Sequence, residues 1–372
     1  MSRFDLLDPA PVTATEYAGI EDRCRDVLAT EQTTLVLQGE AMVFLEAAAR
    51  GLGRPGGRAL NLVTGPYGGT FGEWLAQAGT DVENLVVPFD RAVRPEQVEE
   101  ALQRVGPVDL VSLVHAEAAT GVVNDLAPIS RVARSWGALV VVDAVASVGA
   151  EPLAIDGWHL DMVVLSAQKA LAGPCAVSVV TVSPGAWAAL ARHPAPWRGS
   201  VLSLLDWRDH WAEAGRSVLP VIPGHLETRA LGAAVERVQA EGLDGVVSRH
   251  RAASRATRAA LAPLGLLPWA RQPAEAASVA TLVRAPAEGA AALLRASLAG
   301  SEDLSVLVST APGALAESAL RVNHTGRRAT LPAVQSAVAG LARGLLALGH
   351  EADLASALAV VTETWYATLG NG

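Results

Sequence analysis

Lys169, in the stretch VVLSAQKALAGP (163–174), is the only lysine of this 372-residue chain, and the other 28 of its 29 basic residues are arginine. Arginine replaces lysine wherever a surface cation is needed, but its guanidinium keeps its proton up to a pKa of about 12 or above. A desolvated lysine amine loses its proton and forms a Schiff base with an aldehyde. The isolated lysine therefore indicates covalent chemistry, with chance survival of a surface lysine as the alternative.

Asp143 supplies a second reactive group, 26 residues before Lys169. It lies near the end of the apolar run ALVVVDAV (138–145), and Lys169 follows the run DMVVLS (161–166). A carboxylate at the end of a buried strand is costly unless it has a partner. Pyridoxal phosphate (PLP) needs both groups, because its aldehyde binds an amine and its ring nitrogen stays protonated beside an acid.

A glycine turn and an aromatic residue complete the candidate site. Gly39-Glu40-Ala41 joins the strand-like run TTLVLQ (33–38) to a helix predicted over 40–50. Such a turn presents backbone N–H groups and the helix dipole to a phosphate. Tyr67 lies in a glycine-rich turn after another predicted strand and is suited to stacking on a pyridine ring, although an ordinary turn aromatic is the alternative.

Short apolar runs alternating with helical patterns must position these residues. The predicted strands are 33–38, 58–64, 85–90, 109–115, 138–145, 161–166 and 175–183, and the helices between them are 40–50, 95–106 and 126–137. The pattern predicts an α/β fold with a mainly parallel, seven-stranded sheet covered on both faces. Ligands of such sheets bind at the carboxyl ends of the strands, where Tyr67, Asp143 and Lys169 fall.

The composition of the sequence changes after about residue 240, where helical segments become rich in arginine and alanine. Three strand candidates follow, at 278–285, 304–310 and 319–324. The last long helix is predicted over 331–349. We therefore expect a large cofactor-binding domain over 15–240. A smaller α+β domain is expected over 241–372, together with residues 1–14.

These stretches together resemble the class V, fold-type I PLP-dependent aminotransferases, the group of the alanine–glyoxylate and serine–pyruvate enzymes. The resemblance covers roughly residues 30–350 and rests on LVLQGEAMVFLEAAA, NLVTGPYGGTFGEW, HAEAATGVVNDLAPI, GALVVVDAVASVGA, SAQKALAGP and LRVNHTG. Two more stretches, VLSLLDWRDHW and ASALAVVTE, are similar to the pyridoxamine–pyruvate aminotransferase branch.

The resemblance implies a role for each matching residue. Lys169 is the lysine that holds the cofactor aldehyde and moves the proton, and Asp143 is the partner of the ring nitrogen. Val145 and Tyr67 match the residues on the two faces of the ring. The remaining matches are Thr120 near the ring oxygen, Gly39, Glu40, Ala41 and Gln168 at the phosphate, and Arg321 as the clamp for the substrate carboxylate. The resemblance also implies a homodimer.

The chain departs from the family pattern around the substrate and the subunit contact. Ile222-Pro223 stands where the family often has Thr-Pro, and Pro312 stands where the pyridoxamine branch has a second arginine. Pro174-Cys175-Ala176 replaces a glycine-containing turn, and the N-terminal Gly-Pro signature is missing or shortened. These departures leave Lys169 and Asp143 untouched.

Composition narrows the class of protein. The net charge of −9 and the absence of a basic patch argue against a nucleic-acid partner. No apolar run reaches the ~18 residues of a membrane span, and no signal peptide is recognisable, so we expect a cytoplasmic protein without a membrane partner. Two cysteines give neither a disulfide framework nor metal-ligand spacing.

The leading hypothesis is a PLP-dependent aminotransferase that passes an amino group from a small-molecule donor to a 2-oxo acid such as pyruvate or glyoxylate. A PLP-dependent lyase or decarboxylase is the first alternative, motivated by Pro312 and the N-terminal departure. A non-catalytic protein that binds PLP or a related vitamer is the second, motivated by Ile222.

Overall fold

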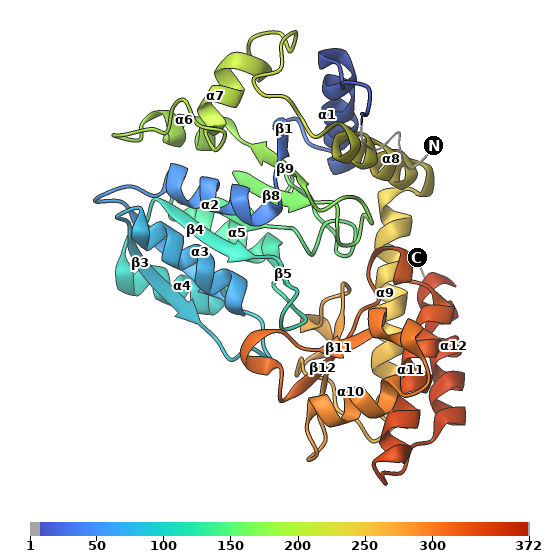
Figure 1. Cartoon of the computed structure of the whole chain (residues 1–372). Coiled ribbons are helices and arrows are strands. Elements are labelled where there is room, and N and C mark those ends of the chain that lie inside the picture. The colour runs from blue at the N-terminus through green and yellow to red at the C-terminus, as the bar shows by residue number, and fades with distance from the viewer. Residues whose placement is uncertain (1–7, 371–372) are drawn as a thin grey trace.

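A seven-stranded sheet is the centre of the larger part of the molecule (Figure 1). The structure is a computed structural model that describes residues 8–370. The strands follow the order β1-β9-β8-β7-β4-β2-β3, and all of them run parallel except β9, which pairs antiparallel with both of its neighbours. They are β1 (Thr33–Gln38), β2 (Arg58–Val63), β3 (Asp81–Val86), β4 (Leu110–Val114), β7 (Leu139–Asp143), β8 (Met162–Ser166) and β9 (Val177–Val182). The predicted mainly parallel, seven-stranded α/β fold is confirmed.

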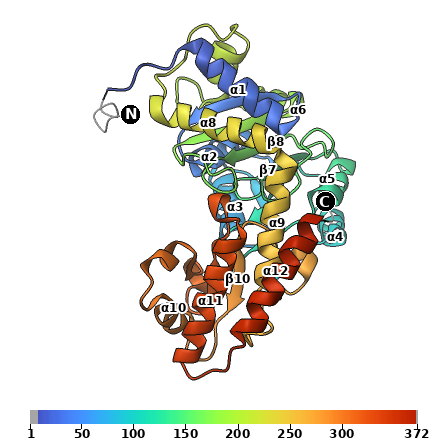
Figure 2. The ribbon, with the colours of Figure 1, turned by 90° about the vertical axis from the view of Figure 1, so that its right-hand side faces the viewer.

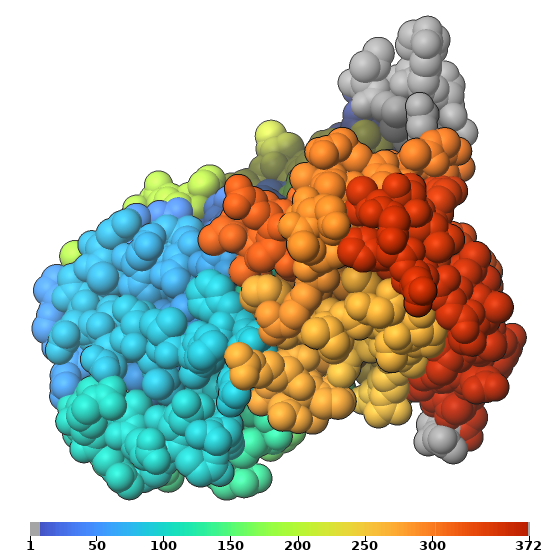
Figure 3. Space-filling view, turned by 90° about the horizontal axis from the view of Figure 1, so that it is seen from below, coloured from blue at the N-terminus to red at the C-terminus, as the bar shows by residue number. Residues whose placement is uncertain are grey.

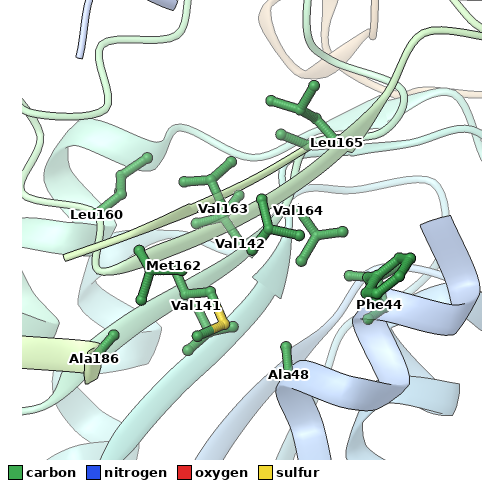
Figure 4. Close-up of a cluster of buried hydrophobic side chains, with 14 of the residues drawn as sticks. Phe44, Ala48, Val141, Val142, Leu160, Met162, Val163, Val164, Leu165 and Ala186 are labelled. Atoms are coloured by element: carbon green, nitrogen blue, oxygen red, sulfur yellow. The ribbon is translucent and has the colours of Figure 1, made fainter. Parts of the chain in front are cut away.

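Helices cover both faces of this sheet, as the uninterrupted apolar strands require. They are α1 (Ala14–Leu28), α2 (Ala41–Leu52), α3 (Pro66–Gln77), α4 (Pro95–Val105), α5 (Leu126–Ser135), α6 (Pro184–Ala191), α7 (Leu204–Trp207) and α8 (His225–Glu241), with a π-helical turn at Arg208–Ala212. A short hairpin, β5 (Ala116–Glu117) and β6 (Val122–Val123), follows β4. Figure 4 shows the buried side chains of β7 and β8 with Phe44 and Ala48 of α2 beside them.

One strand lies four residues earlier than the sequence pattern predicted. We expected a strand over 85–90, whereas β3 spans Asp81–Val86 and pairs in register from Arg58↔Asp81 to Val63↔Val86. β3 is an edge strand whose polar residues face solvent, so it lacks the apolar signature of a buried strand. Pro88, which has no backbone N–H, cannot extend the ladder.

The smaller part of the molecule packs helices on a three-stranded antiparallel sheet (Figure 2). Its strands, in the order β10-β12-β11, are β10 (Thr281–Arg284), β11 (Val308–Thr310) and β12 (Ala319–Val322). Its helices are α9 (Leu243–Ala259), α10 (Ala290–Leu298), α11 (Leu331–Ala347) and α12 (Leu354–Gly370), with 3₁₀ turns at Pro273–Glu275, Glu302–Val306, Gly313–Leu315 and Gly326–Arg328.

Two expectations for this part were wrong. The predicted strand 304–310 is a 3₁₀ turn followed by the three residues of β11, and Val306 is half exposed rather than in the sheet. α11 is not the last long helix, because α12 follows it and packs against α9. The buried side chains of Ala357, Val361 and Trp365 attach α12 to the second core. Nothing in that segment alone indicates this partner.

The two parts have separate hydrophobic cores, one built around the seven-stranded sheet and one around the three-stranded sheet. The division near residue 240 stays a prediction. Residues 1–7 lie outside the described residues, and Ala10, Pro11 and Val12 contact α8 through Arg229 and His225. The assignment of residues 1–14 to the small domain therefore stays a prediction as well.

Two salt bridges connect the larger and the smaller part of the molecule at the interface between them. Asp90 of the larger part lies 2.7 Å from Arg271 Nε and 2.9 Å from an amino nitrogen of Arg284. Figure 3 shows the cyan and orange segments of the two parts in contact. Among the described residues, no helix combines the length and the apolar character needed to cross a bilayer.

The sheet holds α3, which carries Tyr67, through a buried asparagine. Asn61 of β2 donates to the Gly68 carbonyl at 2.9 Å and to Asn84 Oδ1 at 2.8 Å, while Ser112 donates to its side-chain oxygen. A Cβ on Gly72 would lie 2.4 Å from the Asn61 amide nitrogen, whereas a Cβ on Gly69 would meet no atom within 4 Å. The close approach of α3 to the sheet therefore requires glycine at 72 and not at 69.

We expect Gly72→Ala to lower the free energy of unfolding by about 1–3 kcal/mol, because the methyl group displaces Asn61. Gly69→Ala, in the same helix, should instead raise it by up to about 1 kcal/mol, since alanine loses less backbone entropy. Urea denaturation of both variants measures the difference. Equal changes in the two variants would contradict the packing of α3 described here.

Candidate active site

A cavity of about 230 Å³ lies at the carboxyl edge of the sheet. The ends of β4 and β7, the turn after β8 and the first turns of α2 and α3 surround it. Its lining residues are Glu40, Ala41, Met42, Leu45, Tyr67, Val114, Ala116, Ala118, Asp143, Val145, Ala146 and Lys169. Six residues of the predicted site are therefore brought together: Glu40, Ala41, Tyr67, Asp143, Val145 and Lys169.

Lys169 lies in the turn that follows β8 and is half-buried. Burial lowers the pKa of its amine, and the positive charge of Arg321 lowers it further. The carboxylates of Glu40 and Asp143 act in the opposite direction without cancelling the shift. The site therefore lowers the free-energy cost of forming the neutral amine, which is the nucleophilic form.

Asp143 is the last residue of β7, and its side chain is buried at the cavity wall. Burial raises the pKa of its carboxyl to about 6, while a hydrogen bond from the Val145 N–H to Oδ1 at 2.9 Å opposes the rise. Val145 itself lines the cavity two residues later. At neutral pH the carboxylate remains charged in a poorly solvated place, which is the condition for holding a protonated ring nitrogen.

Tyr67 is the second residue of α3 and keeps about a third of its surface exposed at the cavity. Burial of the hydroxyl raises its pKa, and the charge of Arg321 partly opposes this. Tyr67 thus links the cavity to Arg321, which lies on β12 of the small sheet and does not line the cavity.

Arg321 is half-buried, and its Nε is buried without a hydrogen-bond partner among the described residues. Burial lowers the pKa of its guanidinium. A buried guanidinium nitrogen without a partner is costly. A carboxylate that accepts from it would remove that cost.

The predicted phosphate turn has the expected backbone, but the carboxylate of Glu40 lies at the helix start where a phosphate was expected. Gly39 precedes α2 with a left-handed φ of +143°, and its N–H donates to the Ala176 carbonyl. Glu40 is the N-cap of α2, and its Oε2 accepts from the Met42 N–H at 2.8 Å. Gln168 Nε2 donates to the other carboxylate oxygen of Glu40, also at 2.8 Å.

Thr120 is not brought to the cavity. It is fully buried, and its hydroxyl donates to the Thr64 carbonyl at 3.2 Å. Its predicted role near the ring oxygen therefore stays a prediction, and the hydroxyl is engaged within the fold. The β5–β6 hairpin that carries Thr120 contributes Ala116 and Ala118 to the wall instead.

Glu117, between those two alanines, is a buried acid that the sequence analysis missed. Burial raises the pKa of its carboxyl to about 8, and the nearby charge of Asp143 adds to the rise. The N–H of Ala119 donates to its Oε1 at 3.4 Å, and its Oε2 has no partner among the described residues. An acid inside the stretch HAEAATG was the available signal. Its burial, which makes this carboxyl unusual, is recognisable only from the fold.

The residues of the cavity fit the pyridine ring and the aldehyde of PLP. An amine of lowered pKa, a buried carboxylate and an aromatic side chain lie together, which is the set of groups that the ring and the aldehyde need. The phosphate end fits less well, because a carboxylate already accepts from the N–H of Met42. Among the described residues that line the cavity, Lys169 is the only cationic one.

The buried acid Glu117 should produce a measurable pH dependence of stability. Its folded pKa of about 8 lies above its ordinary value of 4.5, so the folded state retains a proton that the unfolded state loses. Stability should therefore fall as the pH rises from about 5 to about 8. Glu117→Gln removes this group, so at pH 8 the variant should be the more stable protein by at least about 1 kcal/mol.

Denaturation of the wild type and of Glu117→Gln at pH 5 and at pH 8 tests this prediction. Other buried acids, such as Glu21 and Glu151, are present in both proteins, so their contribution to the pH dependence cancels in the comparison. An identical pH dependence with and without Glu117 would show that its carboxyl is already ionised in the folded state.

Comparisons with known proteins agree with this site. The family described as Aminotransferase class-V matches residues 12–298. The chain is 30% identical to a pyridoxamine–pyruvate transaminase of Mesorhizobium japonicum over 77% of this chain and 72% of that protein. It is 29% identical to an L-aspartate–glyoxylate aminotransferase of Paracoccus denitrificans over 84% and 78%.

A solved structure shares the whole architecture. The crystal structure of pyridoxamine–pyruvate aminotransferase from Mesorhizobium loti matches with a TM-score of 0.91 and 26% identity, covering 98% of this chain and 93% of that chain. Since the match covers 98% of this chain, it includes both sheets. On these grounds the chain belongs to the class V aminotransferases, which are PLP-dependent enzymes of fold type I.

Proposed function

We propose that this enzyme transfers an amino group to a small 2-oxo acid of the pyruvate or glyoxylate type, with Lys169 as the catalytic residue. The observation that carries the proposal is the cavity that joins Lys169, Asp143 and Tyr67, with Arg321 close enough to lower the pKa of the lysine. Relatives named for pyruvate or glyoxylate support the choice of acceptor.

Each side chain has a defined task in this proposal. PLP, when bound, supplies an aldehyde that accepts the amino group and a ring that takes up electrons. The Lys169 amine, whose pKa is lowered by burial, would hold the aldehyde and then move a proton between the substrate carbon and the cofactor carbon. Asp143 holds the proton on the ring nitrogen, and Tyr67 packs on the ring. Arg321 binds the substrate carboxylate by two parallel hydrogen bonds.

The proposal has a direct test because Lys169 is the only lysine. Borohydride treatment of PLP-loaded enzyme should attach a pyridoxyl group to one peptide, the one that contains Lys169. Lys169→Ala should remove both the label and the turnover. An enzyme that acts as a lyase or decarboxylase would not convert bound PLP to pyridoxamine phosphate with an amino donor, and a non-catalytic binder would show no turnover.

A homodimer is the proposed assembly, with the active sites near the subunit contact. The large apolar side chains of Val201, Val218 and Ile222 are 66%, 73% and 87% exposed, which favours a protein contact for the segment between α6 and α8. Gly224, at the end of this segment, donates to Gln38 Oε1 beside the Gly39 turn. We also retain the cytoplasm as the proposed location.

Glu40 favours a second candidate for the amino donor, pyridoxamine without a phosphate group. Its carboxylate caps α2 at the place where a phosphate would be bound, and a dianion there would face a negative charge. Pyridoxal and pyridoxamine have a hydroxyl group at this end, which would donate to the carboxylate. The name of the relative from Mesorhizobium japonicum supports this donor.

For the clamp, we expect Arg321→Lys to lower kcat/KM for the 2-oxo acid about 10- to 100-fold, mainly through KM. Lysine keeps the charge but loses the fork of two hydrogen bonds. Arg327→Lys is the matched control, since Arg327 is exposed and follows in the same segment. Steady-state kinetics measure the difference, and an equal effect of both changes would remove Arg321 from the substrate site.

The second candidate, pyridoxamine as the donor, predicts that the wild-type enzyme binds pyridoxal more tightly than PLP. Glu40→Gln should shift this preference toward PLP by at least about tenfold, because the facing charge is removed. Glu46→Gln, on the same helix and paired with Arg50, is the control. Titration of the ligand absorbance measures the affinities. Tighter binding of PLP to the wild type, unchanged in Glu40→Gln, would contradict this candidate.

A further inference from the structure

A turn of the small domain touches the backbone of Lys169. Gly326 begins the 3₁₀ turn after β12 and has a left-handed φ of +61°. A Cβ on Gly326 would lie 2.8 Å from the Lys169 carbonyl oxygen and 3.0 Å from the Ala172 Cβ. The backbones of the two domains therefore meet directly behind the catalytic lysine, at a distance that only glycine permits.

Two neighbouring residues of α9 hold Gly326 in this position. Its N–H donates to His250 Nε2 at 2.9 Å, and Arg249 donates to its carbonyl oxygen at 2.6 Å. His250 is fully buried, and its Nδ1 lies 2.7 Å from the Val246 carbonyl. Since a carbonyl only accepts, Nδ1 carries the hydrogen and Nε2 is the acceptor for Gly326. Both polar groups of the Gly326 backbone are thus tied to one helix.

The lysine turn is held from its other side by the large domain. Arg237 of α8 donates to the carbonyls of Leu171 and Ala172. Ala172 has a left-handed φ of +51°, which costs a non-glycine residue about 1 kcal/mol or more, and its N–H donates to the Lys169 carbonyl at 3.1 Å. The turn that positions Lys169 is therefore confined between α8 and the Gly326 turn.

Arg321 lies on the same short segment, five residues before Gly326. Its strand β12 is the middle strand of the small sheet and pairs with both β10 and β11, so the segment moves with that sheet. Any displacement of β12 relative to the large domain reaches the Lys169 carbonyl through Gly326. The substrate-carboxylate clamp and the catalytic amine are thereby placed by one backbone contact.

We propose that Gly326 is a positioning residue that sets the place of Lys169 in the cavity and links it to the strand that carries Arg321. The link to substrate binding rests on the proposed role of Arg321. The contact with Lys169 does not, because it follows from the backbone geometry alone.

The steric argument gives the expected size of the effect. The atom that a methyl group on Gly326 would meet is a backbone oxygen, which cannot rotate away as the end of a side chain does. One of the two turns must therefore shift by a few tenths of an ångström or more. Misplacement of a catalytic group by about 1 Å is enough to lower a rate about a hundredfold.

A matched pair of variants separates this contact from ordinary backbone strain. Gly326→Ala introduces the clash and the unfavourable φ, whereas Gly265→Ala introduces only the φ, since Gly265 has φ +67° and no atom within 4 Å of its Cβ position. We expect kcat to fall between about 10- and 100-fold in Gly326→Ala and less than about twofold in Gly265→Ala. Thermal denaturation confirms that both variants are folded.

The single lysine gives a second readout that needs no cofactor and no turnover. An amine-directed reagent, read by mass spectrometry of the Lys169 peptide, reports the pH midpoint of labelling in the ligand-free protein. Arg321, Glu40 and Asp143 are the charged groups around the amine. We expect the midpoint to rise toward the ordinary lysine value in Gly326→Ala, because the amine leaves its buried place, and to stay unchanged in Gly265→Ala.

A second pair keeps the test informative if Gly326→Ala does not fold. Arg249→Ala releases the Gly326 carbonyl without a clash, and Arg255→Ala, an exposed residue of the same helix, is its control. The labelling midpoint should shift in Arg249→Ala only. Labelling and kcat that match the controls in both pairs would overturn the role of Gly326. A wild type without turnover but with a Gly326-dependent labelling midpoint would instead contradict the proposed function alone.

Discussion

Removal of water from an amine and a carboxylate at one edge of the sheet is the constraint on which the rest of the structure depends. Burial raises the pKa of Asp143 to about 6 and lowers the pKa of Lys169, and the opposite charge of each group opposes the shift of the other. The sheet places the two groups near each other, since β7 and β8 are adjacent parallel strands and Asp143, at the end of β7, pairs with Val164 of β8 shortly before Lys169. The apolar residues of both strands keep water away from this edge. Asp143 lies at the end of β7, and Lys169 lies in the turn that follows β8.

The same constraint explains how the surrounding acids are arranged. Glu117, buried beside Asp143, has a pKa raised to about 8 and so remains neutral when Asp143 is charged. Two buried carboxyls that interact cannot both ionise at low cost, and their environments divide the charge between them. Glu40 is different, because the N–H of Met42 and the amide of Gln168 stabilise its negative charge at the start of α2. A phosphate would have to compete with that charge.

The smaller part of the molecule, built on the three-stranded sheet, contributes to the site in two ways. It brings the buried guanidinium of Arg321 near the lysine, and it presses the Gly326 turn against the lysine backbone. The long helix α9 connects these functions, because it enters the small domain directly after α8 and holds Gly326 through His250 and Arg249. Arg321 and Lys169, which are far apart in the sequence, are thus brought near each other by elements of both parts of the molecule.

The amino-acid sequence by itself determined the mainly parallel sheet and indicated Lys169 and Asp143 as candidate site residues, because buried parallel strands have uninterrupted apolar runs and a lone lysine among arginines is a visible exception. Edge strand β3 and helix α12 were misplaced or missed, since an exposed edge has no apolar signature and α12 depends on its contact with α9. Only the tertiary structure decided that Glu40 caps a helix, that Glu117 is buried beside Asp143 and that Gly326 meets Lys169. Each of these depends on how segments that are remote in the sequence pack together, and on the loss of water from the groups that this packing buries.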